Sequence, residues 1–231
     1  MEQLPKGYTL HLPEGAFPLS TDSMLLAHAV RLPRGARVLD LGSGCGTLGL
    51  LLCAKDESCT VTGLEISEAA HAGALENIRR NCLDSRLSSI CRDLRSLPAE
   101  FANRFHCCVS NPPYFSGGPA SAATPIARRD DCCSPGDLFR AASGALRYGG
   151  DFFLVHKPER LAQLIGCGAA NQLEAKNLTL VRHKEGGPIT LILLQFRKGG
   201  KPGLQIQEHC LFDSRGVPTS YYREVYHMQG E

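Results

Sequence analysis

The sequence lacks the features that would assign it to a membrane, secreted or fibrous class of protein. It has no tryptophan, and aromatic residues make up only 6% of its 231 residues. No apolar run reaches the roughly 18 residues of a membrane-spanning helix. Residues 1–15 contain no apolar stretch of the kind that export signals have, so we expect a cytoplasmic protein. The net charge of +2 is too small to indicate a nucleic-acid partner by itself.

The eleven cysteines form no recognisable site. No C-x-x-C spacing occurs, and the adjacent pairs Cys107-Cys108 and Cys132-Cys133 suit neither zinc nor an ordinary disulfide. An odd number also argues against a complete disulfide framework. We therefore expect reduced thiols that act as small buried hydrophobic residues, and no metal site, with one redox-active or metal-binding exception left open.

Strand-like and helix-like stretches alternate through the middle of the chain. The predicted strands are Arg37–Leu41, Thr60–Ile66, Leu87–Cys91, Phe105–Ser110 and Gly150–His156, and the predicted helices are Thr47–Ala54, Ser67–Cys82, Asp137–Leu146 and Pro158–Leu173. This alternation is typical of a doubly wound α/β fold with a parallel sheet. Leu178–Arg182 and Ile189–Phe196 flank the turn EGGP, which predicts two antiparallel neighbouring strands.

The same pattern divides the chain into three parts. Residues 1–33 form an N-terminal preamble of loop and one helix at Asp22–Leu32, residues 34–199 form the α/β domain, and residues 200–231 form a tail that packs on it. The long connection Phe115–Pro135 is rich in small residues and proline, and a loop of this length in a compact domain is usually functional or mobile.

A glycine-rich turn follows the first predicted strand and opens a helix. In Asp40-Leu41-Gly42-Ser43-Gly44-Cys45-Gly46, Gly42 and Gly44 allow a tight turn and a close approach to a ligand, and Gly46 allows close packing of the helix. Glu65 ends the next strand, where a carboxylate can accept two hydrogen bonds from a ribose diol. These residues predict a nucleotide-type cofactor site, although a glycine-rich turn without a ligand stays open as an alternative.

The spacing favours S-adenosylmethionine over a dinucleotide. The run is G-x-G-x-G rather than G-x-G-x-x-G, and Asp40 would repel a pyrophosphate but suit an ammonium group. Asp93, after the third strand, is a candidate partner for the adenine amine, with a solvated loop acid as the alternative. The predicted cofactor set further includes Ser43, Ile66, Leu94 and Asn111.

A second motif, Asn111-Pro112-Pro113-Tyr114, follows the fourth strand at the same edge of the sheet. A planar amine has its lone pair delocalised and attacks poorly until acceptors hold its hydrogens. The Asn111 side-chain carbonyl and the Pro112 backbone carbonyl are two such acceptors, and consecutive prolines fix the backbone. Tyr114 offers a face for stacking. The alternative is a rigid proline turn without a ligand.

These residues resemble class I S-adenosylmethionine-dependent methyltransferases with an N/D-P-P-Y/F motif. More narrowly, the chain is similar to the bacterial tRNA(Val) adenine-N6 methyltransferase-like family. The stretches that carry the resemblance are FPLSTDSMLLA (Phe17–Ala27), VLDLGSGCGTLGL (Val38–Leu50), NPPYF with Ala127–Arg129, HKPERL (His156–Leu161) and RKGGKPGL (Arg197–Leu204).

The resemblance implies a Rossmann-like, three-layer α/β/α fold whose seven-stranded sheet has an antiparallel last strand. It implies that S-adenosylmethionine is bound by Asp40, Gly42, Gly44, Gly46, Glu65 and Asp93, with S-adenosylhomocysteine as the product. Asn111 to Tyr114 would hold the target amine, and Asp22 would lie near the methionine end of the cofactor.

The charge distribution indicates where a nucleic acid would bind. The segment 176–201 has a local charge of +5, from Lys176, Arg182, Lys184, Arg197, Lys198 and Lys201 against Glu185, whereas residues 36–100 carry −2. A basic region beside a nearly neutral cofactor half suits an RNA backbone, although a solvated basic hairpin gives the same pattern. The predicted substrate contacts are Phe115, Arg128, Arg129, Lys184, Arg197 and Lys198.

The favoured function is therefore methylation of an adenine N6 amine in tRNA. Methylation of a protein glutamine side chain at N5, methylation of a guanine N2 amine, and a cofactor- or RNA-binding module without catalysis are the alternatives. The sequence leaves the oligomeric state open between a monomer and a weak dimer.

Overall fold

The computed structural model describes residues 2–13, 19–112 and 133–226. Its centre is an eight-stranded sheet with the order β10-β8-β9-β7-β6-β3-β4-β5. The strands are β3 (Arg37–Leu41), β4 (Thr60–Glu65), β5 (Leu87–Cys91), β6 (Phe105–Ser110), β7 (Leu146–His156), β8 (Leu173–Lys184), β9 (Ile189–Lys198) and β10 (Gln205–Phe212). Only β9 runs against its neighbours, β7 and β8, so the predicted α/β fold with an antiparallel strand is confirmed.

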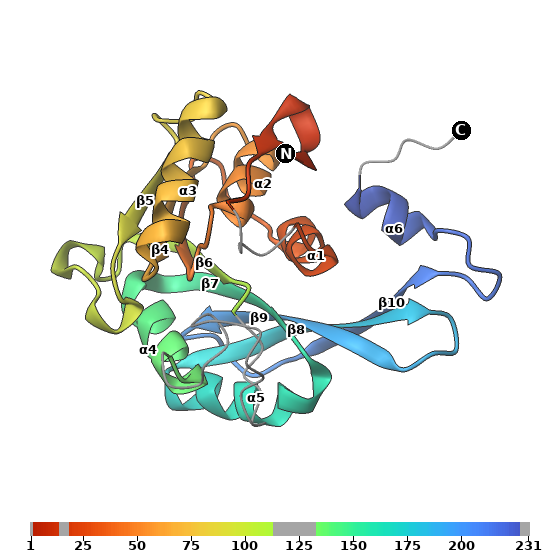
Figure 1. Cartoon of the computed structure of the whole chain (residues 1–231). Helices are drawn as coiled ribbons and strands as arrows, with labels where there is room; N and C mark the ends of the chain where they lie inside the picture. The colour runs from red at the N-terminus through yellow and green to blue at the C-terminus, as the bar shows by residue number, and fades with distance from the viewer. Residues whose placement is uncertain (1, 14–18, 113–132, 227–231) are drawn as a thin grey trace, which may run out of the picture.

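Helices cover both faces of this sheet (Figure 1). One face carries α1 (Thr21–Ala29), α2 (Thr47–Lys55) and α3 (Glu68–Arg80), and the other carries α4 (Pro135–Ala145) and α5 (Leu161–Ala170). Short 3-10 turns occur at Pro5–Gly7, Leu94–Ser96, Ala99–Phe101 and Pro158–Arg160, and β1 (Glu2–Gln3) pairs with β2 (Thr9–Leu10) in a separate small sheet.

The three-layer arrangement follows from strands that are apolar on both faces. Successive strand residues point to opposite faces, so Val38 enters the core under α1 and α2 while Leu39 enters the core under α4. Phe153 and Phe152 divide between the two cores in the same way. Near-continuous apolar runs are what buried parallel strands require.

The structure differs from the sequence-based prediction at three strands. β8 begins at Leu173 rather than Leu178, and the predicted helix Pro158–Leu173 ends earlier, with α5 ending at Ala170. β10 pairs in parallel with β8 at the edge of the sheet, so the sheet has eight strands rather than seven. Its sequence QIQEHCLF is largely polar, as suits an edge strand that has one neighbour and is mostly exposed. Even its apolar residue Ile206 is exposed. β7 begins at Leu146 rather than at Gly150. Gly149 and Gly150 resemble a turn in the sequence, but in the structure they lie within the strand. The pairing of β7 with β6 shifts register nearby, between Phe105 and Cys107.

The N-terminal preamble is tied to α3 by two asparagines. The Asn77 side chain accepts from the backbone N–H of His11 at 2.8 Å and donates to its carbonyl at 2.9 Å. Asn81 makes the same pair of bonds with Thr9, both at 2.8 Å. Asn77 also donates to the carbonyl of Cys45 at 3.0 Å, so the preamble and the glycine-rich turn share one anchor.

The last helix, α6 (Ser220–Val225), brings the C-terminal segment against α1. The Tyr221 ring stacks on His209 with centroids 3.9 Å apart and meets His28 of α1 edge-on at 5.7 Å. The Tyr226 hydroxyl lies 3.0 Å from Thr21 Oγ1. The C-terminal segment thus contributes a sheet strand and a helix that supports α1.

The described cysteines are free thiols, several of them buried in the two cores. Within residues 2–13, 19–112 and 133–226 no cluster of His, Cys, Asp or Glu could hold a metal ion. No helix in the described parts of the chain is long and apolar enough to span a membrane.

Candidate active site

The glycine-rich turn closes against the end of the neighbouring strand. The backbone N–H groups of Gly42 and Ser43 both donate to the Leu64 carbonyl, at 2.9 and 3.0 Å. Gly42, Gly44 and Gly46 all have positive φ angles of 74°, 54° and 83°, which residues with side chains rarely adopt. The turn therefore depends on glycine at these positions and lies beside the carboxyl end of β4.

Glu65 faces this turn. One carboxylate oxygen accepts from Gly44 N at 2.7 Å and the other accepts from Ser67 N at 2.9 Å. Each carboxylate oxygen has a second lone pair, so both can still accept from a hydroxyl. These two hydrogen bonds fix the orientation of the Glu65 carboxylate, which suits a vicinal diol. The next residue, Ile66, is 50% exposed and offers an apolar surface beside Glu65.

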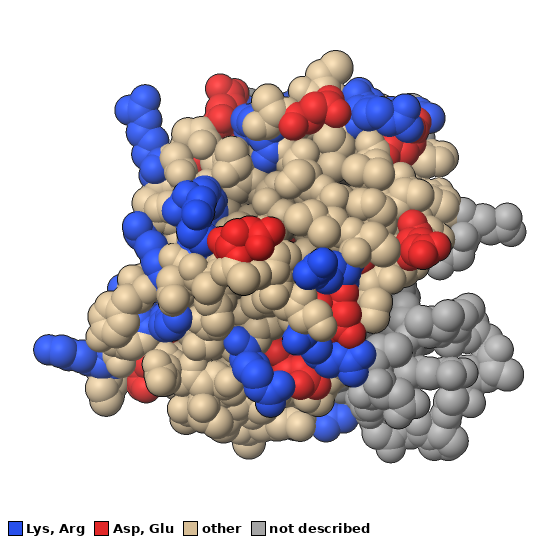
Figure 2. Space-filling model, turned by 90° about the vertical axis from the view of Figure 1, so that its left-hand side faces the viewer, with Lys and Arg blue, Asp and Glu red and all other residues tan. Residues whose placement is uncertain are grey.

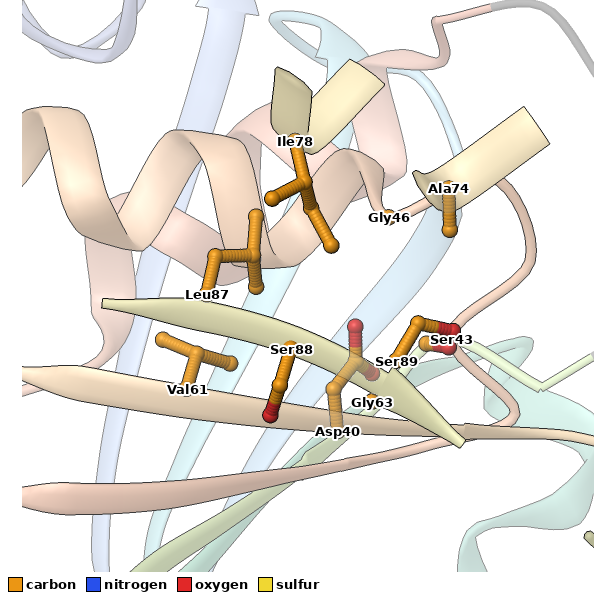
Figure 3. A pocket seen from close by; sticks show the side chains of 11 residues that line it. Asp40, Ser43, Gly46, Val61, Gly63, Ala74, Ile78, Leu87, Ser88 and Ser89 are labelled. Atoms are coloured by element: carbon orange, nitrogen blue, oxygen red, sulfur yellow. The ribbon is translucent and has the colours of Figure 1, made fainter. Parts of the chain in front are cut away.

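Asp40 lies almost fully buried under the turn, with a relative exposure of 1%. Its Oδ1 and the Ser43 hydroxyl have no hydrogen-bond partner among the described residues, and both line a small cavity under Gly46 and Ala74 (Figure 3). Burial, with a smaller contribution from Glu65, raises the pKa of Asp40 to about 8. A positive charge nearby would favour its ionised form.

Asp93 and Leu94 follow β5 at the same edge of the sheet. Asp93 accepts from the Arg95 backbone N–H at 2.8 Å and from its guanidinium at 2.6 to 3.1 Å. Hydrogen bonds from Arg95 lower the pKa of Asp93, so it is held as a carboxylate. An adenine amine bound here would share this carboxylate with Arg95, while half-buried Leu94 packs against the core under α4.

One hydrogen bond joins the two motifs. The Ser110 hydroxyl donates to the Leu41 carbonyl at 2.7 Å. Leu41 directly precedes Gly42 and Ser110 directly precedes Asn111, so this bond and the parallel pairing of β3 with β6 together hold Asn111 beside the glycine-rich turn. No local pattern in the sequence marks Ser110, because its partner is 69 residues away in the chain.

Asn111 also contacts the first turn of α1. Its Nδ2 donates to Ser23 Oγ at 3.0 Å, and the buried Pro112 follows it. The neighbouring Asp22 has a pKa raised by burial, an effect that Lys157 partly offsets. Through Ser23 the preamble therefore contacts Asn111, and Asp22 stays a predicted site residue. The predicted residues Pro113, Tyr114, Phe115, Arg128 and Arg129 lie outside the described residues.

The predicted basic contacts separate onto two edges of the sheet. Lys184 ends β8, whose direction matches β7, so it lies on the edge where Asn111 lies. Arg197 pairs with Asp151 in the middle of β7, away from the carboxyl end of that strand, and forms an ion pair with it at 2.8 Å. Lys198 Nζ donates to the carbonyls of Ser143 and Leu146 at 2.6 and 2.9 Å. The structure therefore does not bring Arg197 and Lys198 to the candidate site.

On the side of the molecule at the β5 edge, the described residues carry basic and acidic side chains that are interspersed rather than grouped by sign (Figure 2). This agrees with the small charge of residues 36–100.

Comparison with known proteins relates this chain to one family. Residues 16–166 match the family model described as the methyltransferase small domain. The chain is 31% identical over 195 residues to a tRNA1(Val) (adenine(37)-N6)-methyltransferase of Bacteroides fragilis, covering 83% of this chain and 81% of that protein. It is 30% identical over 234 residues to the protein of the same name from Edwardsiella ictaluri, covering 94% and 93%.

Among solved structures, the fold is similar to that of a predicted O-methyltransferase from Agrobacterium tumefaciens. The TM-score is 0.76 with 22% identity, covering 90% of this chain and 96% of that one.

Proposed function

This chain belongs to the methyltransferase small domain family, and from that membership we propose that it methylates the N6 amine of an adenine in tRNA, with S-adenosylmethionine as methyl donor. The observation that carries the proposal is the Ser110–Leu41 hydrogen bond, which holds Asn111 beside the glycine-rich turn. Two relatives that are 30–31% identical over most of their length are named for this reaction.

The residues at the turn fit the cofactor. When bound, S-adenosylmethionine supplies a methyl group on a positively charged sulfur. In our proposal the Glu65 carboxylate accepts from the ribose diol, Ile66 contacts the adenine ring, and Asp93 accepts from the adenine amine. The buried Asp40 oxygen, which has no partner among the described residues, suits a cationic ligand near the turn.

At the second motif, the acceptors hold the target amine. We propose that Asn111 Oδ1 and the Pro112 carbonyl accept hydrogen bonds from the two N–H groups of the adenine amine. These bonds turn the nitrogen lone pair toward the methyl group. Tyr114 stacks on the base and Pro113 restricts the backbone. Positioning of this kind is the main source of catalysis in a transfer that needs no strong general base.

The substrate enters from the carboxyl edge of the sheet. A base amine is reachable only when the base is unstacked, as in a tRNA loop. In our proposal Lys184 contacts the phosphate backbone on this edge, and Phe115, Arg128 and Arg129 lie near the base. We propose that the protein acts in the cytoplasm, where tRNA is modified.

The test is incubation of the purified protein with methyl-labelled S-adenosylmethionine and either total tRNA or total protein. We expect label in tRNA that is released by ribonuclease and found in N6-methyladenosine. Label in a protein fraction that resists ribonuclease would indicate the glutamine reaction, and label in N2-methylguanosine would indicate the guanine reaction. Either result would contradict the proposal.

A further inference from the structure

We propose that Ser23, in the first turn of α1, is a positioning residue that fixes which way the Asn111 amide points. This inference rests on the proposed function, because it concerns the acceptor oxygen that Asn111 offers to the target amine. It extends that function to a residue that neither the glycine-rich turn nor the N-P-P-Y motif contains.

A side-chain amide can rotate by 180° and exchange its oxygen with its nitrogen. Only one of these two orientations presents Oδ1, the acceptor, to an incoming amine, whereas the other presents a second donor. In the structure, Asn111 Nδ2 donates to Ser23 Oγ at 3.0 Å. Because Nδ2 is held on the α1 side, Oδ1 is directed away from α1.

The surrounding hydrogen bonds allow the Ser23 hydroxyl oxygen to act as an acceptor. Ser20 is the N-cap of α1, and its hydroxyl oxygen accepts from the Ser23 backbone N–H at 3.3 Å. The Ser23 hydroxyl lies 3.3 Å from the same oxygen. When Ser23 donates its hydrogen to Ser20, its own oxygen is left to accept from Asn111. The hydroxyl of Ser110, which precedes Asn111 in the chain, donates to the Leu41 carbonyl and does not compete.

Ser23 is held rigidly enough to act in this way. It is buried, with a relative exposure of 7%. The opposite end of α1 is fixed by Lys55, whose Nζ donates to the carbonyls of Ala27, His28 and Val30 at 2.7 to 2.9 Å. A residue on a well-anchored helix can orient a partner that lies at the end of a strand.

The activity test compares three variants by steady-state kinetics on tRNA. Ser23→Ala removes the acceptor and keeps a good helix former, so the fold should be retained. We expect its kcat to fall about three- to tenfold, with the Kd for S-adenosylmethionine unchanged. Ser23→Thr keeps the hydroxyl and should recover most of that loss. Thr21→Val, on the same helical turn, removes a hydroxyl that contacts Tyr226 and should leave kcat within twofold.

A second readout needs no substrate. In the ¹⁵N-edited spectrum of the ligand-free protein, the Asn111 side-chain amide is identified by its absence in Asn111→Asp. Its two resonances should shift in Ser23→Ala and stay in place in Thr21→Val. This readout separates the two proposals. If the resonances shift in Ser23→Ala but the wild-type protein methylates no tRNA adenine, the role of Ser23 is supported and the proposed substrate is wrong.

The opposite result would overturn the role of Ser23 alone. If the wild-type protein methylates tRNA adenine while Ser23→Ala keeps kcat within twofold and leaves the Asn111 resonances unmoved, Ser23 does not orient Asn111. A loss of melting temperature together with a matching loss of cofactor affinity would show a structural role instead, which also contradicts the proposal.

Discussion

At the scale of single residues, the site consists of side chains whose orientation is set by backbone groups. Glu65 is held by Gly44 and Ser67, and Ser110 is held by Leu41. The sequence predicts that Asp40, Glu65 and Asn111 share one edge, because the carboxyl ends of parallel strands meet there. It does not reveal Ser23, since a buried serine in a predicted helix has no feature that marks a partner 88 residues away.

Glu65→Ala should weaken binding of S-adenosylmethionine about 10- to 100-fold, because two charge-assisted acceptors for the ribose are lost. Isothermal titration calorimetry measures the change. Glu68→Ala, at the exposed first residue of α3, serves as the control. Unchanged affinity in Glu65→Ala would refute the ribose assignment.

The buried Asp40 predicts a link between cofactor binding and protons. Its pKa of about 8 means that it is mostly protonated at pH 7 without ligand, and a bound cation would lower that pKa and release a proton. Calorimetry at pH 7 in buffers of different ionisation enthalpy should show proton release in the wild type and little in Asp40→Asn. Equal apparent enthalpies in all buffers for the wild type would contradict this.

The raised pKa of Asp40 also makes the stability of the protein depend on pH. Because the folded-state pKa lies above the unfolded value near 3.9, the native state keeps a proton that the unfolded state loses. Asp40 therefore makes the free energy of unfolding fall as the pH rises from about 4 to about 8. Asp40→Asn should flatten this part of the pH profile, measured by urea unfolding.

At the scale of elements, α1 is the part of the preamble that reaches the site. The sequence predicts this helix at Asp22–Leu32 and the structure has it at Thr21–Ala29. The strands that position the motifs, β3, β5 and β6, have the predicted bounds, because buried strands bordered by turn residues are well defined in sequence. β10 escapes sequence-based prediction because partly exposed edge strands lack an apolar pattern, and its parallel pairing with β8 is a long-range property.

Lys55→Met should destabilise the protein by about 1–3 kcal/mol, since three carbonyls at the end of α1 lose a charged donor. The expected drop in Tm is several degrees. Lys201→Met, at an exposed position, is the control. A Tm for Lys55→Met equal to that of the control would show that this capping does not hold α1.

At the scale of the whole molecule, the basic segment 176–201 is divided by the sheet topology. Because β9 runs antiparallel, its basic end at Arg197 and Lys198 lies toward the edge of the sheet away from the site. Neither the local charge nor the spacing of the basic residues in the sequence predicts this. Arg197 and Lys198 stabilise the packing of β7, β9 and α4 instead. The sequence therefore predicts which motifs share one edge of the sheet better than it predicts where the basic side chains lie.

This division can be tested with a matched pair of substitutions. Lys184→Gln should raise the KM for tRNA about two- to fivefold and reduce the salt dependence of binding, because one phosphate contact is lost. Arg197→Gln should leave that KM unchanged and lower the melting temperature slightly. The reverse pattern would place the RNA on the opposite edge of the sheet.

The account as a whole depends on the transfer of a methyl group to an adenine amine held by Asn111. The most direct measurement is mass spectrometry of nucleosides from tRNA treated with S-adenosylmethionine and either the wild-type protein or Asn111→Ala. We predict N6-methyladenosine with the wild type and none with Asn111→Ala, although calorimetry shows near-normal cofactor affinity in the variant. N6-methyladenosine at comparable levels with both proteins, or with neither while both bind the cofactor, would contradict the account.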